Sequence, residues 1–371
     1  MEYVELGNVA TYINGYAFKP EQRGKIGLPI IRIQDLNDNS YDLGFFDGSY
    51  PEQIEINTGD ILISWSGSLG VYKWSKGKAL LNQHIFKVVF NKINIDKEFF
   101  CYAVKNSLSV MSQQTHGATM KHITKKDFDK VLIPYPSLNT QRKIAQKLNI
   151  VTELIVFYET ELSLMEQLIK ARFIEMFGDP QINEKGFTKA PMGEYLSLLT
   201  DFSSNGSYKA LDSGVVMYDE PNYAWMVRTT DLESGDKSSI KYIDEKAYEL
   251  LSKSKIFGGE IIMNKIGSAG KIYIIPKLTM PASLGRNAFM FRYDERINNI
   301  FIYYLLTSDY GQREIQQYVR GAVTKTITKD DARAVLIIVP PLELQQQFAD
   351  FVHQVDKSRF DIKKSIIELE R

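Results

Sequence analysis

Cysteine and histidine are scarce in this sequence of 371 residues. The chain has one cysteine, Cys101, and four histidines, and these residues show no spacing typical of a metal site. A single cysteine excludes an intramolecular disulfide and any zinc site built from several cysteines, as is usual for proteins of the reducing cytoplasm. We therefore expect this chain to bind no metal.

Net charge and long apolar runs are also missing. The 45 Lys and Arg residues balance the 45 Asp and Glu residues, so no global cationic field attracts nucleic acid. No apolar run approaches the roughly 20 residues that a membrane-spanning helix needs. The opening MEYVELGNVA has neither the basic region nor the apolar region of a secretory signal. We expect a soluble, cytoplasmic protein.

The motifs of common catalytic sites are absent from the sequence as well. DEPNYAW at 219–225 comes nearest to the Asn/Asp-Pro-Pro-Tyr/Phe motif of amino-methyltransferases, but it lacks the second proline. No glycine loop is followed by the Lys-Ser/Thr of a Walker A motif. The Gly-x-x-Gly turns at 67–70 and 267–270 are too short to indicate a phosphate site. The sequence therefore gives no positive support for an enzyme.

What the sequence does contain is an internal repeat. The longest match aligns HGATMKHITKKDFDKVLIPYPSLNTQRKIA (116–145) with RGAVTKTITKDDARAVLIIVPPLELQQQFA (320–349) without a gap. Three more pairs of segments align: 28–36 with 223–232, 58–70 with 258–270, and 82–88 with 285–291. The chain is therefore two copies of one unit, and each copy is a domain followed by a helix.

The domain of each copy is predicted to be α+β, with a curved sheet and one main helix pair. Short β-rich runs such as DILISW and HIFKVVF are bounded by Gly, Asn and Asp. The stretch at 96–114 and its counterpart at 297–317 are predicted to be helical. The predicted parts are a first domain at 1–136, a central helix at 137–178, a second domain at 179–340 and a distal helix at 341–371.

A heptad pattern of apolar residues follows the domain of each copy, which is typical of a coiled-coil seam. Pro136 and Pro340 stand where a helix can begin, and Gly178-Asp179-Pro180 ends the first helix. An apolar stripe must be buried against another element, and chain connectivity favours an antiparallel partner helix. The predicted fold is two similar β-rich globular heads separated by a long antiparallel two-helix coiled coil with approximate twofold symmetry. The residues predicted for the helix seam and subunit docking are Ile144, Leu148, Val151, Ile155, Tyr158, Leu162, Met165, Ile169, Phe348, Val352, Val355, Ile362, Ile366 and Leu369.

Three segments carry a family resemblance: QRKIAQKLNIVTELI, FIEMFGDPQINEKGF and the domain end HGATMKHITKKDFDKVLIPYP. With their order and duplication, the chain resembles the specificity subunit of type I restriction-modification systems. The resemblance implies two target recognition domains that each read one half of a bipartite double-stranded DNA sequence. It also implies that the helices dock two methyltransferase subunits, joined by restriction subunits. S-adenosylmethionine and ATP would then bind to those partner subunits, and this chain would bind no cofactor and catalyse no reaction.

Charge is segregated along the first copy. Residues 33–72 contain seven acids and no Lys or Arg, whereas residues 73–130 contain eleven lysines and four acids. Such segregation allows a cationic face for DNA phosphates. A solvated charge pattern without a role in binding is the alternative.

Comparison of the two copies suggests which residues contact DNA. Residues that are alike in both copies are interpreted as scaffold or phosphate contacts, and residues that differ as base readers. Gln and Asn suit adenine, and Arg suits guanine. The candidate DNA-binding residues are Trp65, Ser66, Ser68, Lys73, Gln83, His84, His116, Lys121, His122, Arg228, Lys265, Ser268, Arg286, Asn287, Arg320 and Lys325.

Structural roles remain open for several of these residues. Trp65 could be a core or sheet-surface aromatic, and His84 could be a hydrogen-bonded strand residue. Arg32 and Arg228 could pair across a turn with the aspartates three positions later. Two other functions are also open for the whole chain: a specificity subunit of a type II-like methyltransferase and nuclease system, or a coiled-coil scaffold whose heads bind proteins.

Overall fold

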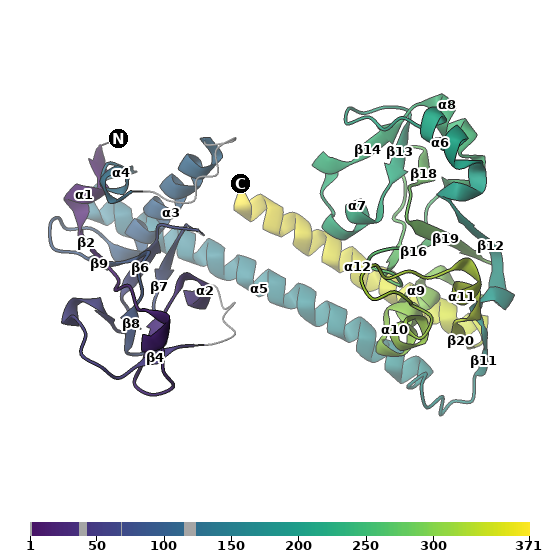
Figure 1. Ribbon diagram of the computed structural model, residues 1–371, viewed down its shortest axis with the longest axis horizontal. Helices are drawn as coiled ribbons and strands as arrows, with labels where there is room; N and C mark the ends of the chain where they lie inside the picture. The colour runs from purple at the N-terminus through teal and green to yellow at the C-terminus, as the bar shows by residue number, and fades with distance from the viewer. Residues whose placement is uncertain (1, 37–42, 68, 115–123) are drawn as a thin grey trace. The chain divides into compact units, whose positions relative to one another are not determined.

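The computed structural model describes residues 2–36, 43–67, 69–114 and 124–371 (Figure 1). The chain divides into two compact units, Met1–Val156 and Phe157–Arg371, here called unit 1 and unit 2. The boundary between them falls inside the long helix α5 (Leu138–Phe177). Each unit has its own sheets and its own core.

Unit 1 contains two four-stranded sheets and a two-stranded ribbon. Its strands are β1 (Tyr3–Glu5), β2 (Thr11–Asn14), β3 (Leu28–Ile31), β4 (Phe45–Phe46), β5 (Glu55–Ile56), β6 (Ile61–Ser64), β7 (Gly70–Lys73), β8 (Ala79–Leu81), β9 (Ile85–Val89) and β10 (Leu132–Pro134). Its helices, besides the start of α5, are α1 (Leu6–Val9), α2 (Ile33–Leu36), α3 (Lys97–Gln114) and α4 (Lys125–Asp129). The sheets have the orders β2-β9-β6-β7 and β4-β3-β8-β5, and β1 pairs with β10. Within the second sheet β3 and β8 run parallel.

The core of unit 1 lies on both sides of its first sheet. Ile63 of β6 belongs to the cluster formed with α3, α4 and the start of α5, whereas its neighbour Leu62 belongs to the cluster formed with the second sheet. Successive side chains of a strand point to opposite faces, so a strand buried on both faces is apolar at consecutive positions. This explains the uninterrupted ILI of β6.

Unit 2 repeats this architecture. Its strands are β11 (Thr188–Pro191), β12 (Leu196–Asp201), β13 (Ala224–Val227), β14 (Lys241–Ile243), β15 (Lys255–Ile256), β16 (Ile261–Asn264), β17 (Ile272–Ile274), β18 (Ala282–Leu284), β19 (Ala288–Tyr293) and β20 (Leu336–Val339). Its helices are α6 (Tyr208–Gly214), α7 (Thr229–Ser234), α8 (Glu245–Leu250), α9 (Asn299–Thr307), α10 (Asp309–Gln316), α11 (Lys329–Ala334) and α12 (Leu342–Glu370), besides the end of α5. The sheet orders β12-β19-β16-β17 and β14-β13-β18-β15 match those of unit 1 strand for strand. The predicted α+β class with two similar β-rich domains is confirmed.

Two details of the predicted domains differ from the structure. Each unit has two four-stranded sheets where one curved sheet was expected, and the chain crosses between them several times, for example between β8 and β9 and between β18 and β19. The helix predicted at 297–317 is broken into α9 and α10. Ser308 is extended there and its hydroxyl accepts a hydrogen bond from the backbone of Gly311, so it caps a new helix.

Helix α12 packs against the last part of α5 within unit 2 (Figure 1). Phe348 of α12 contacts Phe177 and Phe173 of α5, with ring centroids 5.5 and 5.4 Å apart. Three residues further along α12, Phe351 lies under the guanidinium of Arg172. Residue numbers rise along α12 as they fall along α5, so the two segments are antiparallel, as predicted.

The structure shows the surroundings of some of the predicted seam residues. Ile169, Phe348, Val352 and Val355 are buried in the core of unit 2, and Met165 packs against it. Ile144 packs instead against the core of unit 1. For the remaining seam residues the helix pairing stays a prediction: Leu148, Val151, Ile155, Tyr158, Leu162, Ile362, Ile366 and Leu369.

Candidate nucleic-acid interface

Three residues connect β8 to β9 in unit 1 and β18 to β19 in unit 2, and the last two of them form a turn. The turn residues are Gln83 and His84 in unit 1 and Arg286 and Asn287 in unit 2, the same pairs that the repeat aligned. The second residue of each turn has a positive φ, 72° at His84 and 68° at Asn287. This left-handed conformation is uncommon for residues with a side chain. The two units therefore share a backbone at this turn and present different side chains from it.

In unit 2 this turn belongs to a cluster of three loops. The backbone N–H of Lys265 donates to the carbonyl of Asn287 with an N–O distance of 2.9 Å. The backbone N–H of Gly267 donates to the carbonyl of Lys325, also at 2.9 Å, and a β-bridge between neighbouring residues adds to this link. The unit 2 loop cluster, as it is called below, consists of Lys265–Gly270, Arg286–Asn287 and Arg320–Thr326.

Unit 1 shows the first of these links. The backbone N–H of Trp65 donates to the carbonyl of His84 at 3.2 Å, as Lys265 does to Asn287 in unit 2. Four predicted contacts lie outside the described residues: Ser68, His116, Lys121 and His122. The structure therefore joins the first two loops of unit 1, and the third stays a prediction.

Trp65 in unit 1 corresponds to Lys265 in unit 2, and the residues that these two side chains contact also differ between the units. Nε1 of Trp65 donates to Oδ1 of Asn14 at 3.2 Å, and its ring stacks on Phe86 with centroids 5.6 Å apart. Nζ of Lys265 lies 2.7 Å from Oδ2 of Asp201. Asn14 and Asp201 end the corresponding strands β2 and β12. A neutral pair in unit 1 thus replaces an ion pair in unit 2, and both side chains are engaged within their own unit.

Asp201 is the centre of a polar network beside the unit 2 loop cluster. Its carboxylate, 6% exposed, accepts hydrogen bonds from Lys265, from Lys329 at 2.8 Å, and from the hydroxyls of Ser203 and Ser204 at 2.7 Å each. Burial acts to raise the pKa of Asp201, but hydrogen bonds from the two ammonium groups and the two hydroxyls outweigh it and hold the pKa well below its usual range. The ionised carboxylate therefore joins β12, the loop at Lys265 and the start of α11.

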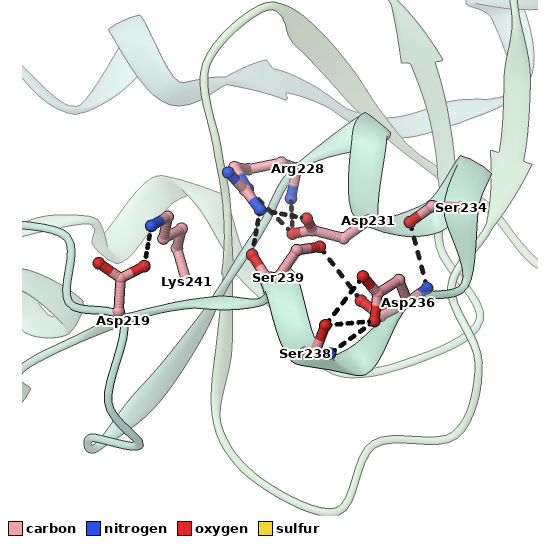
Figure 2. A network of polar contacts seen from close by, with 8 residues as sticks. All are labelled: Asp219, Arg228, Asp231, Ser234, Asp236, Ser238, Ser239 and Lys241. Atoms are coloured by element: carbon pink, nitrogen blue, oxygen red, sulfur yellow. Dashed lines mark hydrogen bonds and ion pairs between the residues drawn. The ribbon is translucent and has the colours of Figure 1, made fainter. Parts of the chain in front are cut away.

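Arg228 is held by a bidentate ion pair (Figure 2). Its Nη2 lies 2.5 Å from Oδ1 of Asp231, its Nε lies 3.2 Å from Oδ2, and it also donates to the backbone carbonyl of Ser239. In unit 1, Nε of Arg32 lies 3.4 Å from Oδ2 of Asp35. The alternative that these arginines pair across a turn is confirmed, and Arg228 fixes the start of α7.

The charge segregation seen in the sequence is reduced by ion pairs within unit 1. Two lysines of the basic stretch pair with acids of the acidic stretch, and a third, the predicted DNA contact Lys73, pairs with an acid of α3. These pairs are Lys73 with Glu98, Lys78 with Glu55 at 2.8 Å, and Lys87 with Asp60 at 3.1 Å. The cationic face inferred from the sequence is therefore partly neutralised at these three positions.

The remaining predicted contacts differ in exposure. Ser66 is buried. The side chain of Arg320 is 74% exposed and pairs with Asp331 at 2.9 Å. Lys325 is exposed, and its side chain makes no hydrogen bond or ion pair within the described part of the chain. Also exposed are Gln83, Ser268, Arg286 and Asn287.

A pocket of about 210 Å³ opens beside the β18–β19 turn. Arg286, Asn287 and Arg228 are among the residues that line this pocket. Its apolar lining residues include Phe202, Val215, Met217 and Met226. Sequence comparison missed this pocket, because three of these apolar residues lie in segments outside the aligned repeat.

Asp201 and Lys329 were likewise not predicted from the sequence. Asp201 could have been found from one signal: a lysine in the place of a tryptophan, next to a buried strand, needs an acid nearby. Lys329 gives no such signal, since its contact with Asp201 spans 128 residues of sequence.

Residue types suited to metal binding do not gather in the described part of the chain, where no group of three or more His, Cys, Asp or Glu side chains could hold an ion. Burial raises the pKa of the Cys101 thiol to about 12, which leaves little thiolate at neutral pH. Among the described helices, none is both long and apolar enough to cross a membrane.

Solved structures share this fold. The S subunit of a type I restriction-modification system from M. genitalium has 15% sequence identity and a TM-score of 0.55, covering 100% of this chain and 92% of that one. A chain from a structural study of complex assembly and conformational transition in the type I R-M system has 16% identity and a TM-score of 0.57, covering 100% and 94%.

Curated relatives extend over most of the sequence. The EcoBI specificity subunit of Escherichia coli is 24% identical over 388 residues, which covers 98% of this chain and 81% of the relative. The MjaVIII specificity subunit of Methanocaldococcus jannaschii is 24% identical over 376 residues, covering 96% and 86%. The family model of the type I restriction modification DNA specificity domain matches twice, at residues 1–166 and 197–371, and so spans both units. The chain belongs to the family of type I restriction-modification DNA specificity proteins.

Proposed function

We propose that this chain is the sequence-specific DNA-binding specificity subunit of a type I restriction-modification complex. One observation carries the proposal: equivalent turns with the same left-handed backbone present Gln83 and His84 in one unit, and Arg286 and Asn287 in the other. Phosphate contacts position a protein on DNA, whereas base contacts specify the sequence. A shared scaffold with different side chains therefore suits two units that each read one half of a bipartite target.

The helices supply the surface for partner subunits in this proposal. Helix α5 carries a series of exposed apolar side chains outside the predicted seam, and exposed apolar patches often mark protein interfaces. These residues are Ile150, Leu154, Val156, Phe157, Leu164, Leu168 and Ile174. We assign them to the docking of two methyltransferase subunits, which restriction subunits join.

Catalysis belongs to those partners in the same proposal. The methyltransferase subunits bind S-adenosylmethionine and the restriction subunits bind ATP, while this chain holds no cofactor and catalyses no step. The complex acts in the cytoplasm, where it meets double-stranded DNA. The family match favours a type I system over a type II-like one or a protein-binding scaffold.

Mapping of methylated adenines in cells with and without the gene tests the proposal. We expect a bipartite motif with modified adenines on opposite strands, which disappears when the gene is deleted. An unchanged methylation pattern would contradict the proposal. A purified complex with the methyltransferase that binds no duplex DNA would indicate the scaffold instead.

A further inference from the structure

Arg286 occupies the first position of the β18–β19 turn, where unit 1 has Gln83. The turn is fixed on one side by the strands and on the other by the hydrogen bond from the Lys265 backbone to Asn287. A side chain on such a turn starts from a fixed backbone position. Its direction then depends on the neighbours that hold it.

Three neighbours hold the guanidinium of Arg286. It lies over the ring of Phe202, 5.1 Å from the centroid, and over Tyr208, 5.6 Å from the centroid. Nη2 also donates to Oδ1 of Asp212 at 3.1 Å. Phe202 belongs to the short 3-10 helix η4 (Phe202–Asn205), and the other two neighbours belong to α6. The chain thus orients this guanidinium before any ligand arrives, which lowers the entropy cost of binding.

Most hydrogen-bonding capacity of Arg286 is unused. A guanidinium has five N–H donors, and Arg286 makes one hydrogen bond within the described residues, to Asp212. Its side chain is 41% exposed and borders the pocket of about 210 Å³. Arg228, which lines the same pocket, already uses its guanidinium to donate hydrogen bonds to Asp231 and to the Ser239 carbonyl. Of these two arginines, Arg286 keeps the larger number of N–H donors without a partner among the described residues.

We propose that Arg286 reads a guanine in the major groove within the half-site of unit 2, an inference that rests on the proposed function. Arginine donates in a fork to O6 and N7 of guanine, and this geometry matches no other base edge. Asp212 is a positioning residue that acts through Arg286. Gln83 at the same place in unit 1 suits adenine, so the two halves differ at the equivalent base.

The test measures the affinity of the purified complex with its methyltransferase subunits for duplexes that carry the methylation motif. The wild-type motif must contain a guanine. We expect Arg286→Gln to weaken binding to that duplex by about 5- to 150-fold and to remove the preference for guanine at one position of one half. Arg313→Gln on α10, which removes an exposed arginine paired with Gln181, is the matched control and should leave the preference unchanged.

Two further variants separate base reading from other roles. Arg286→Lys keeps the charge but loses the fork of donors, so it should weaken the preference for guanine at the same position. It also replaces Arg286→Gln if the complex with that variant fails to assemble. Asp212→Asn should lower the preference at the same base alone and have no further effect when Arg286 is already changed.

Several results would overturn the inference while leaving the proposed function intact. These are a motif without guanine, an unchanged preference in the Arg286 variants, and equal weakening on every duplex, which is the behaviour of a phosphate contact. A wild-type complex without any bipartite motif would instead remove the proposed function.

Discussion

At the scale of single residues, the two units differ in matched pairs. Trp65 with Asn14 in unit 1 becomes Lys265 with Asp201 in unit 2, at the equivalent place of the equivalent sheet. An isolated change from tryptophan to lysine would leave a largely buried ammonium without a counter-charge, which is strongly destabilising. The two members of each pair therefore have to change together, for a reason that does not involve DNA.

The Asp201 network makes stability depend on pH. The pKa of the Asp201 carboxyl is lower in the folded protein than in the unfolded chain, so the unfolded chain takes up the proton first as pH falls. The stabilisation by Asp201 is therefore fully present above about pH 4, the ordinary carboxyl pKa, and is lost progressively below it. Denaturant unfolding of the wild type and of Asp201→Asn should show a constant difference in stability from neutral pH down to that point. A difference that stays unchanged in stronger acid would contradict this role.

Lys325 lies in the unit 2 loop cluster, is exposed and has no side-chain partner in the described part of the chain, which suits a phosphate contact. We expect Lys325→Ala to weaken binding of the complex to all duplexes alike and to make the salt dependence of affinity shallower by about one unit. Lys277→Ala is the control, since Lys277 is also exposed and follows the opposite end of the β16–β17 hairpin. An unchanged slope for Lys325→Ala would remove this residue from the interface.

At the scale of elements, a buried glutamine fixes the start of each long helix. Gln345 accepts from the backbone of Asn298 at 2.8 Å and donates to the carbonyl of Pro340 at 2.8 Å. In unit 1, Gln141 makes the same two contacts, at 2.9 and 2.8 Å. Both side chains are fully buried. In each unit this glutamine joins the start of the long helix to the residue just before an earlier helix, α3 in unit 1 and α9 in unit 2.

Loss of the Gln345 amide should leave buried polar groups of the backbone without partners. We expect Gln345→Ala to lower the free energy of unfolding of unit 2 by about 1–3 kcal/mol, measured by denaturant titration. Gln347→Ala, at an exposed position two residues away, should change it by less than about 0.5 kcal/mol. Equal effects of the two substitutions would show that the buried glutamine does not stabilise unit 2.

The elements also show how far the sequence could predict the fold. Prolines, glycines and the apolar heptads indicated both long helices, because these signals are local. The turns at His84 and Asn287 were also found from a local signal, the matching short segments around them. The division of each unit into two sheets was not visible, since strand order depends on contacts between distant segments. The partners of Arg286 and Asp201 come from η4, α6 and α11, so no spacing rule could have named them.

At the scale of the whole molecule, duplication separates what is shared from what differs. Sheet order, the left-handed turn and the buried glutamine occur in both units, whereas the side chains on the turn do not. The same division explains how one chain could combine two specificities. The shared scaffold would contact the phosphate backbone, which every DNA half-site has, and the turns would contact the bases, which differ.

Exchange of one unit tests this account most directly. Residues 179–340 would be replaced by the corresponding region of another family member whose methylation motif is known, and methylated adenines would be mapped in cells that express the hybrid with its methyltransferase. The account predicts that one half of the bipartite motif changes to that of the donor, while the other half stays as it was. A motif that changes in both halves, or in neither, would contradict it.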